Sequence, residues 1–252
     1  ERIFIAEKHK KRERFNTPSL NAFAERTRAY MKIEDGCERY CTYCIIPTAR
    51  GFVRSKPIRD IKAEAERLAN AGFSEIVLVG INLTSYGKGE ETDLCDAVEA
   101  VAAVEKIKRV RLGSLEPDHM SDEMLARLSR VEKFCPQFHL SLQSGCDETL
   151  KRMNRHYDTA FYRDLVLRIR KAFKNAAVTT DVMVGFAGET EEEFKKSLDF
   201  VKEIGFAKVH IFAYSRRRGT VAYGLKDQVI RAEKARRSHI MGQAAALSEN
   251  AF

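Results

Sequence analysis

Three cysteines with the spacing Cys-x-x-x-Cys-x-x-Cys, namely Cys37, Cys41 and Cys44, follow Gly36 on one short segment. Thiolates so close together in the chain can converge on one small cluster, and thiolate is the usual ligand of iron–sulfur clusters. Three ligands rather than four leave one iron without a protein ligand. Because a catalytic metal needs an open coordination position, this spacing favours a catalytic iron–sulfur site.

A zinc site is the alternative chemistry for these cysteines. Structural zinc normally has four ligands, often with a second ligand pair elsewhere in the chain. The histidines nearest in sequence, His9 and His119, are isolated. The other cysteines are scattered, with Cys95 and Cys135 in or beside predicted helices and Cys146 after a predicted strand. We interpret these three as packing thiols.

The elements that must position the cysteines alternate between apolar and amphipathic segments. The pattern predicts strands at 29–33, 74–80, 109–114, 138–142, 178–184 and 207–213, and helices at 60–71, 93–106, 121–132, 159–175, 190–204 and 227–249. Such alternation is typical of an α/β fold with a parallel sheet and right-handed crossovers. A partial barrel and a doubly wound open sheet both have this pattern. In both, ligands bind at the carboxyl ends of the strands.

Composition narrows the class of protein. A chain of 252 residues is long enough for one large α/β domain. Its net charge of +8 favours an anionic partner such as nucleic acid, although a basic protein without such a partner is equally compatible. No run approaches the ~18 apolar residues of a membrane span, and no apolar region of a signal peptide follows the first residues. Together with six cysteines that do not form a disulfide pattern, this predicts a cytoplasmic protein.

The segment 32–54, KIEDGCERYCTYCIIPTARGFVR, resembles the signature loop of the radical S-adenosylmethionine (SAM) superfamily, in which an aromatic residue, here Tyr43, precedes the last cysteine. The resemblance implies that Cys37, Cys41 and Cys44 hold a 4Fe–4S cluster whose open iron binds the amino and carboxylate groups of SAM. Reduction then releases a 5′-deoxyadenosyl radical, while the protein positions and shields the reacting groups. The superfamily fold is a partial (β/α)6 barrel, which agrees with the six predicted strands.

Over residues 26–250 the sequence is most similar to the methylthiotransferases, which add a methylthio group to tRNA adenosines or to a ribosomal protein. The segments that carry this similarity are 44–51 (CIIPTARG), 139–145 (HLSLQSG), 153–155 (MNR), 180–190 (TDVMVGFAGET) and 214–220 (YSRRRGT). At Ala187 the family more often has proline, so a less rigid loop is expected there.

Two segments, 79–87 (VGINLTSYG) and 111–117 (RLGSLEP), resemble the branch that acts on N6-threonylcarbamoyladenosine at tRNA position 37. This implies abstraction of the hydrogen on carbon 2 of the adenine, followed by sulfur insertion, with a second SAM supplying the methyl group. The alternatives are a methylthiotransferase for another tRNA adenosine or for ribosomal protein S12, and an iron–sulfur RNA-binding scaffold without turnover.

The resemblance also gives roles to residues at predicted strand ends. The residues expected to bind SAM or the substrate are Tyr43, Gly80, Asn82, Glu116, Gln143, Asp181 and Gly185. For Glu116, Gln143 and Asp181 the alternative is a buried polar group that ties two strands together. For the turn at Gly185, where glycine permits close backbone approach, the alternative is an ordinary strand-to-helix turn.

Basic and aromatic residues near the expected mouth of the site are candidates for RNA contact. Arg216, Arg217 and Arg218 follow the sixth strand, where they would contact tRNA phosphates. A last helix with four basic residues either extends that surface or is simply solvated: Arg231, Lys234, Arg236 and Arg237. Three tyrosines either stack on an anticodon-loop base or pack in the core or rim: Tyr40, Tyr86 and Tyr214. The expected partners are a tRNA anticodon stem-loop and a cellular reductant, and we expect a monomer.

The expected domain organisation is a linker or flanking arm at 1–28, a radical SAM core at 29–225 and a C-terminal helix at 226–252. Methylthiotransferases usually also have an N-terminal domain with three cysteines for a second 4Fe–4S cluster, and a C-terminal RNA-binding TRAM domain. Neither is evident in this sequence. We therefore expect a fragment that cleaves SAM, does not complete methylthiolation and binds tRNA weakly.

Overall fold

The computed structural model describes residues 13–15 and 27–252 of the chain. Most of the arm predicted at 1–28, including His9, lies outside the described residues. Within the described residues, no helix combines the length and the apolar character that crossing a bilayer requires.

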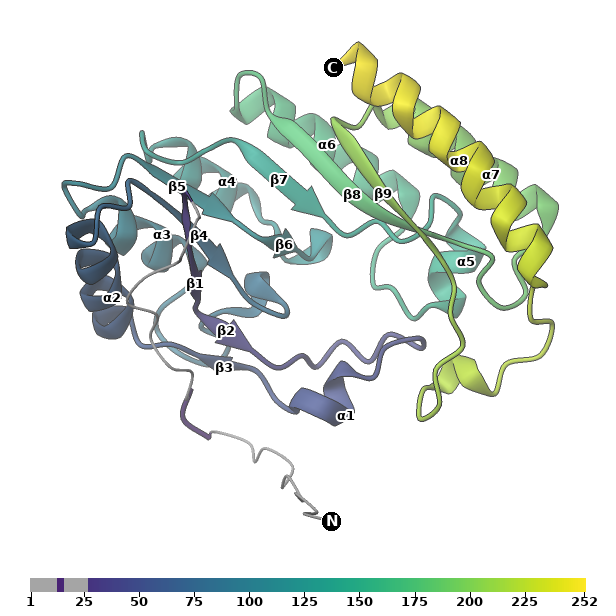
Figure 1. Ribbon diagram of the computed structural model, residues 1–252, viewed down its shortest axis with the longest axis horizontal. Coiled ribbons are helices and arrows are strands. Elements are labelled where there is room, and N and C mark those ends of the chain that lie inside the picture. The colour runs from purple at the N-terminus through teal and green to yellow at the C-terminus, as the bar shows by residue number, and fades with distance from the viewer. Residues whose placement is uncertain (1–12, 16–26) are drawn as a thin grey trace.

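A curved fan of parallel strands forms the centre of the molecule (Figure 1). The strands are β1 (Ala29–Lys32), β4 (Glu75–Val79), β5 (Arg109–Leu112), β6 (Ser114–Leu115), β7 (Gln137–Leu140), β8 (Ala177–Val184) and β9 (Lys208–Ala213). Neighbours follow the order β1-β4-β5 and β6-β7-β8-β9, which is also their order along the chain. A doubly wound sheet would reverse its order at a switch point. The strand order therefore selects the partial barrel from the two predicted alternatives.

Helices cover the outer face of the fan, and all six predicted helices are present (Figure 1). They are α2 (Ile58–Asn70), α3 (Leu94–Ala102), α4 (Asp122–Ser129), α6 (Thr159–Ala172), α7 (Glu191–Ile204) and α8 (Arg231–Ala251). Capping residues fix where several begin, because a side-chain oxygen satisfies a free N–H of the first turn. Asp93 with Asp96 and Thr190 with Glu193 form such capping boxes at α3 and α7.

The third predicted strand, 109–114, is interrupted at Gly113, so that β5 pairs with β4 and β6 pairs with β7. Glycine inside a strand commonly marks such an irregularity. Several short elements were not predicted: β2 (Glu34–Asp35), β3 (Arg54–Ser55), α1 (Ile46–Arg50), α5 (Asp147–Arg152), and the 3-10 turns Leu83–Ser85, Pro117–His119 and Val221–Tyr223. Each is too short to show a hydrophobic period.

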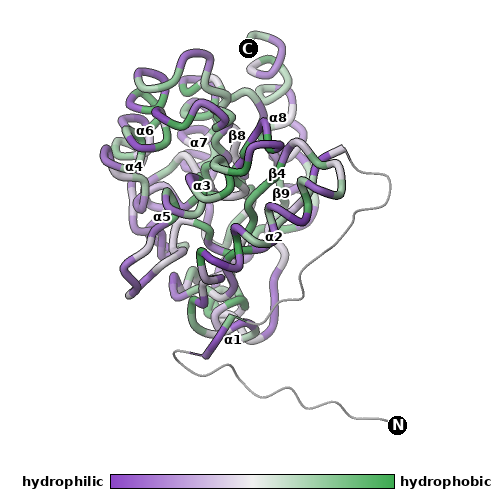
Figure 2. Tube along the Cα trace, turned by 90° about the vertical axis from the view of Figure 1, so that its left-hand side faces the viewer, coloured by the Kyte–Doolittle hydropathy of each residue, from purple (hydrophilic) through white to green (hydrophobic). Residues whose placement is uncertain are grey.

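The hydrophobic core lies between the strands and the helices. In Figure 2 the hydrophobic residues of β4 run through the interior, while hydrophilic residues recur along the surrounding helices. Strand β8 alternates along its length: Val178, Thr180, Val182 and Val184 are buried, and the residues between them are half-buried. The face of β8 that carries Asp181 is therefore less enclosed than the face packed on the helices.

Candidate active site at the cysteine loop

The loop between β2 and α1 carries Cys37, Cys41 and Cys44, and backbone contacts close its base. β2 pairs antiparallel with β3, with Asp35 opposite Arg54. The N–H of Cys37 donates to the carbonyl of Gly51 at 3.0 Å. The start and the end of the loop are thus held side by side without help from the cysteine side chains.

Gly36 is required where the two ends of the loop meet. Its φ is +93°, and a Cβ at this position would lie 2.0 Å from the Phe52 carbonyl oxygen. We expect Gly36→Ala to prevent cluster assembly and to lower the free energy of unfolding by about 1–3 kcal/mol, because backbone atoms cannot yield to the methyl group. Iron content after reconstitution and urea unfolding would measure both effects.

Gly72→Ala is the matched control, since Gly72 has φ +97° but an added Cβ would meet nothing within 4 Å. Equal behaviour of the two variants would show that the contact with Phe52 does not matter.

The far side of the cysteine loop is fastened to the end of α5. The N–H of Thr42 donates to the Met153 carbonyl at 3.0 Å, and the Asn154 amide donates to the Tyr40 carbonyl at 3.0 Å. Tyr40 itself has the left-handed φ of 53°. The loop therefore spans from the first strand to the segment after β7, which holds it over the ends of the strands.

The cysteine side chains lie in a partly enclosed environment. Cys41 is buried, and Cys37 and Cys44 are half-buried. Burial raises the pKa of Cys37 to about 11 and also raises the pKa of Cys44. Both thiols therefore carry protons at neutral pH until a metal displaces them.

The set of three thiols fits a 4Fe–4S cluster with one open iron. Thiolate is the usual ligand of iron–sulfur clusters. Cys37, Cys41 and Cys44 would supply three such ligands from one loop and leave the fourth iron of a 4Fe–4S cluster without a ligand from this set.

A buried ion pair adjoins Cys41. The Arg155 guanidinium lies 3.1 Å from the Cys41 sulfur and pairs with Glu116, and only 3% of the Arg155 side chain is exposed. Arg39 lies 3.8 Å from the same Glu116 carboxylate and 2.7 Å from Asp118. Burial raises the pKa of Glu116 although Arg155 and Arg39 act in the opposite direction. The structure thus places Glu116 beside the cysteine loop, and its contact with SAM or substrate stays a prediction.

Arg155 was not predicted as a site residue, although it lies in the family segment 153–155. An arginine after a short helix carries no signal that separates a buried position from a solvated one. Its position depends on contacts with Cys41 and Glu116, which are distant in the sequence.

The loop after β4 lies against the other side of the cysteines. The Asn82 amide nitrogen lies 4.0 Å from the Cys37 sulfur and donates to the Ser85 hydroxyl at 2.8 Å. The backbone N–H of Asn82 donates to the wholly buried carboxyl of Glu34 at 2.8 Å. A Cβ on Gly80 would lie 2.5 Å from the same carboxyl oxygen. Gly80 and Asn82 therefore adjoin the cysteine loop, whereas Glu34 was not predicted as part of the site.

Burial raises the pKa of Glu34 from 4.5 to about 7. The folded state therefore favours the protonated form of this carboxyl. The free energy of unfolding falls by about 3 kcal/mol in total as the pH rises from 4.5 through 7 and the carboxyl ionises. Glu34→Gln has no proton to lose, so we expect the variant to gain on the parent as the pH rises. Urea unfolding of both cluster-free proteins at pH 5 and pH 8 measures this, and a stability difference that does not change with pH would contradict it.

Gln143, which follows the end of β7, and Asp181, within β8, are neighbours. The N–H of Gln143 donates to the Asp181 carbonyl at 2.8 Å, and Gln143 has a left-handed φ of 68°. The Asp181 carboxylate lies 3.3 Å from Nε2 of His139. Asp181 lies inside β8 rather than at its end, on the half-buried face described above.

The turn at Gly185 is closed by α8. A Cβ on Gly185 would lie 2.4 Å from the Lys234 side chain, and the Gly185 N–H donates to the Glu189 carboxylate. Glu189 in turn pairs with Arg237 at 2.8 Å. Arg237 is buried, so the interpretation that it belongs to an exposed basic face is wrong: the side chain neutralises a buried glutamate instead.

Two of the three candidate stacking tyrosines are buried. Tyr86 donates to the Lys56 carbonyl at 2.5 Å, and Tyr214 packs edge-on against Phe186 at 5.0 Å. Each is 4% exposed, so neither can stack on an RNA base. Tyr40 is 59% exposed and stays available. Tyr43 lies in the small apolar cluster with Phe186, at 6.3 Å between ring centroids.

Arg216, Arg217 and Arg218 follow β9 and are exposed. Arg216 donates to the Tyr223 carbonyl at 2.6 Å and lies over the Tyr223 ring. Arg217 lies near enough to Cys44 to oppose the rise in its pKa that burial causes. The structure therefore places this basic segment beside the cysteine loop.

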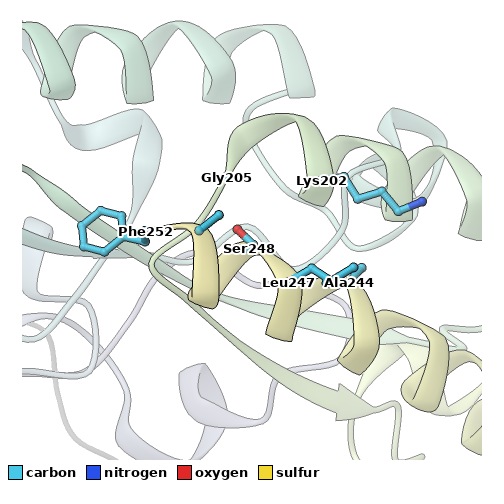
Figure 3. A pocket seen from close by; sticks show the side chains of 7 residues that line it. Lys202, Gly205, Ala244, Leu247, Ser248 and Phe252 are labelled. Carbon is cyan, nitrogen blue, oxygen red and sulfur yellow. The ribbon is translucent and has the colours of Figure 1, made fainter.

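The hollow in Figure 3 lies elsewhere, near the C-terminal end of α8, which Figure 1 places at the opposite side of the molecule from α1. Its lining is mostly apolar and includes Ala244, Leu247 and Phe252. None of the predicted site residues lines it. The packing thiols are also separate from the cysteine loop, and Cys95, Cys135 and Cys146 are all buried, as predicted.

Comparison with known proteins agrees with this site. The model of the family described as "Radical SAM superfamily" matches residues 31–201 of this chain. The chain is 42% identical over 220 residues to the threonylcarbamoyladenosine tRNA methylthiotransferase MtaB of Bacillus subtilis, covering 86% of this chain and 49% of the relative. It is 41% identical over 204 residues to a tRNA-2-methylthio-N(6)-dimethylallyladenosine synthase of Clostridium botulinum, covering 80% and 45%. The chain thus spans about half the length of the curated relatives it matches.

Solved structures share the fold. Coproporphyrinogen III oxidase (HemN) from Escherichia coli, a radical SAM enzyme, superimposes with a TM-score of 0.63 at 18% identity, covering 90% of this chain and 54% of that one. The radical SAM methyltransferase TsrM from Kitasatospora setae gives 0.65 at 15% identity, covering 77% and 38%. With the three-cysteine loop set over a parallel partial barrel and the family description matching most of the sequence, the chain belongs to the radical SAM superfamily.

Proposed function

We propose that this chain is the radical SAM core of a tRNA methylthiotransferase that converts N6-threonylcarbamoyladenosine at tRNA position 37 to its 2-methylthio derivative. The observation that carries the proposal is the 42% identity to the Bacillus enzyme across a segment that includes the whole cysteine loop. When bound, the cluster and SAM supply a 5′-deoxyadenosyl radical that removes the hydrogen on carbon 2 of the adenine.

Different residues of this chain hold the cluster and contact SAM or the substrate. Cys37, Cys41 and Cys44 hold the cluster. The other predicted cofactor-binding residues contact SAM or the adenine: Tyr43, Gly80, Asn82, Glu116, Gln143, Asp181 and Gly185. Arg155, which contacts Cys41, places a buried positive charge beside the cysteine loop that would hold the cluster.

The remaining requirements lie partly outside this chain. A second 4Fe–4S cluster for sulfur insertion belongs to another part of the protein, and the methyl group comes from a second SAM. The core comprises residues 29–225, and the helix at 226–252 leads toward an RNA-binding domain. We place the protein in the cytoplasm, as a monomer that takes electrons from a cellular reductant.

The exposed basic segment after β9 supports RNA binding. We expect Arg217→Glu/Arg218→Glu to weaken binding of an anticodon stem-loop by about tenfold or more at low salt and to flatten its salt dependence, because each phosphate contact releases counterions. Arg59→Glu on α2, where Arg59 is also exposed, is the matched control. Fluorescence anisotropy at several salt concentrations measures this, and equal losses for both variants would contradict a specific surface.

Dimethylallyladenosine is the second candidate substrate, because the Clostridium relative is 41% identical. A chimera in which this chain replaces the matching segment of the Bacillus enzyme tests both. It would be expressed in cells without their own methylthiotransferases, and tRNA nucleosides would be analysed by mass spectrometry. We expect the 2-methylthio derivative of threonylcarbamoyladenosine. The dimethylallyl derivative alone would establish the second candidate, and neither product from a chimera that cleaves SAM would overturn both.

A further inference from the structure

Glu34 is a buried carboxyl whose place in the site the proposed function does not explain. It is 0% exposed and lies in β2, just before the cysteine loop. Its Oε2 accepts the Asn82 N–H at 2.8 Å, and the N–H of Ile81 also faces this carboxyl. Its Oε1 is buried and has no hydrogen-bond partner among the described residues. Since burying an unpaired polar atom is unfavourable, an apolar side chain would serve better for packing alone.

Its contacts converge on the loop after β4. Gly80 presses directly on the side chain, because a Cβ there would lie 2.5 Å from Oε2 and 2.9 Å from the Glu34 Cβ. Two successive backbone N–H groups, those of Ile81 and Asn82, are thus turned toward one carboxyl. Without an acceptor at this point, the Asn82 N–H would lose the hydrogen bond that ties the loop after β4 to β2.

The same loop is linked onward to Glu116. Thr84 donates to the Asn82 side-chain oxygen at 3.0 Å, and the backbone N–H of Glu116 donates to the Thr84 hydroxyl at 3.1 Å. A continuous hydrogen-bonded path therefore runs from Glu34 through Asn82 to Glu116, and two residues of this path are predicted SAM contacts.

We propose that Glu34 is a positioning residue for SAM: its carboxyl holds the backbone of Gly80–Asn82 in the conformation that receives SAM, without touching SAM or the cluster. The inference rests on the SAM site in the proposed function but not on the identity of the RNA substrate. It predicts that SAM affinity, and not cluster content, depends on an acceptor at position 34.

Two substitutions with side chains of similar length test whether the oxygen acceptor at position 34 is needed. Glu34→Gln keeps an oxygen acceptor, and Glu34→Met keeps the packing but removes it. Glu75→Gln is the control, since Glu75 is a buried glutamate at the opposite end of β4, paired with Arg109 and Arg111. Each protein would be loaded with its cluster, its iron counted, and SAM affinity measured by equilibrium dialysis and by the change that SAM causes in the electron paramagnetic resonance (EPR) spectrum of the reduced cluster.

We expect Glu34→Met to contain as much iron as the parent but to bind SAM about tenfold more weakly or worse. A tenfold loss of affinity is roughly the effect of losing one well-placed hydrogen bond. Glu34→Gln and Glu75→Gln should stay within about threefold of the parent on the same scale. Parental SAM affinity in Glu34→Met would overturn the proposal. Loss of iron in Glu34→Met would also overturn it, because Glu34 would then support the cysteine loop. Equally weak SAM binding by Glu34→Gln would overturn it as well. The assay contains no RNA, so its result does not depend on whether the proposed RNA substrate is correct.

Discussion

Replacing Cys37, Cys41 and Cys44 together with alanine is expected to abolish cluster assembly while leaving the barrel folded. The three sulfurs are the proposed cluster ligands, whereas backbone bonds such as Cys37 to Gly51 and Thr42 to Met153 shape the loop. Iron and acid-labile sulfide content, with the EPR spectrum of the reduced protein, would show the loss. Circular dichroism would show that the fold is retained.

A variant with Cys95, Cys135 and Cys146 replaced by alanine is the matched control, because these thiols are buried apart from the loop. It should be less stable, since large-to-small changes in a core leave cavities, yet it should assemble the parental amount of cluster. Assembly of cluster in the first variant and not in the second would contradict the assignment of the ligands.

Replacing Arg155 with methionine should lower the free energy of unfolding by about 3–5 kcal/mol, the cost of leaving one member of a buried ion pair alone. The exposed fractions of the paired side chains are 3% for Arg155 and 11% for Glu116. The double variant Arg155→Met/Glu116→Gln should recover part of this loss, because no unpaired charge then stays buried. Urea unfolding of the parent, the single variants and the double variant measures the coupling.

Arg163→Met is the control for this pair. Arg163 pairs with Glu203 at the surface, where the two side chains are 39% and 51% exposed, so the loss should stay within about 1 kcal/mol. If Arg155→Met costs no more than Arg163→Met, the pair beside Cys41 is not structurally important.

The strands, the outer helices and the cysteine loop could be predicted because each leaves a local signal. A run such as 74–80 is apolar throughout, and Thr190 with Glu193 marks a helix start. The order of the strands in the sheet could not be predicted, because a partial barrel and a doubly wound sheet have the same alternation of strands and helices along the chain. The interruption at Gly113 could not be predicted either, because the pattern of 109–114 is that of one continuous strand.

The contacts that complete the site could not be predicted, because they join distant parts of the chain. Arg155 meets Cys41 only after the cysteine loop reaches across to α5. Glu34 meets Asn82 because β1 and β4 are adjacent strands whose ends lie together. Tyr214 and Arg237 look like surface residues in sequence and become buried because α8 packs on β9 and α7.

SAM cleavage tests directly whether the cysteine loop is a radical SAM site. The chain would be reconstituted anaerobically with iron and sulfide, reduced and given SAM, and 5′-deoxyadenosine would be assayed by chromatography. We expect deoxyadenosine from the parent and none from the Cys37/Cys41/Cys44→Ala variant. A parent that holds a 4Fe–4S cluster and binds SAM but forms no deoxyadenosine would contradict radical SAM chemistry at this site and favour an iron–sulfur scaffold without turnover.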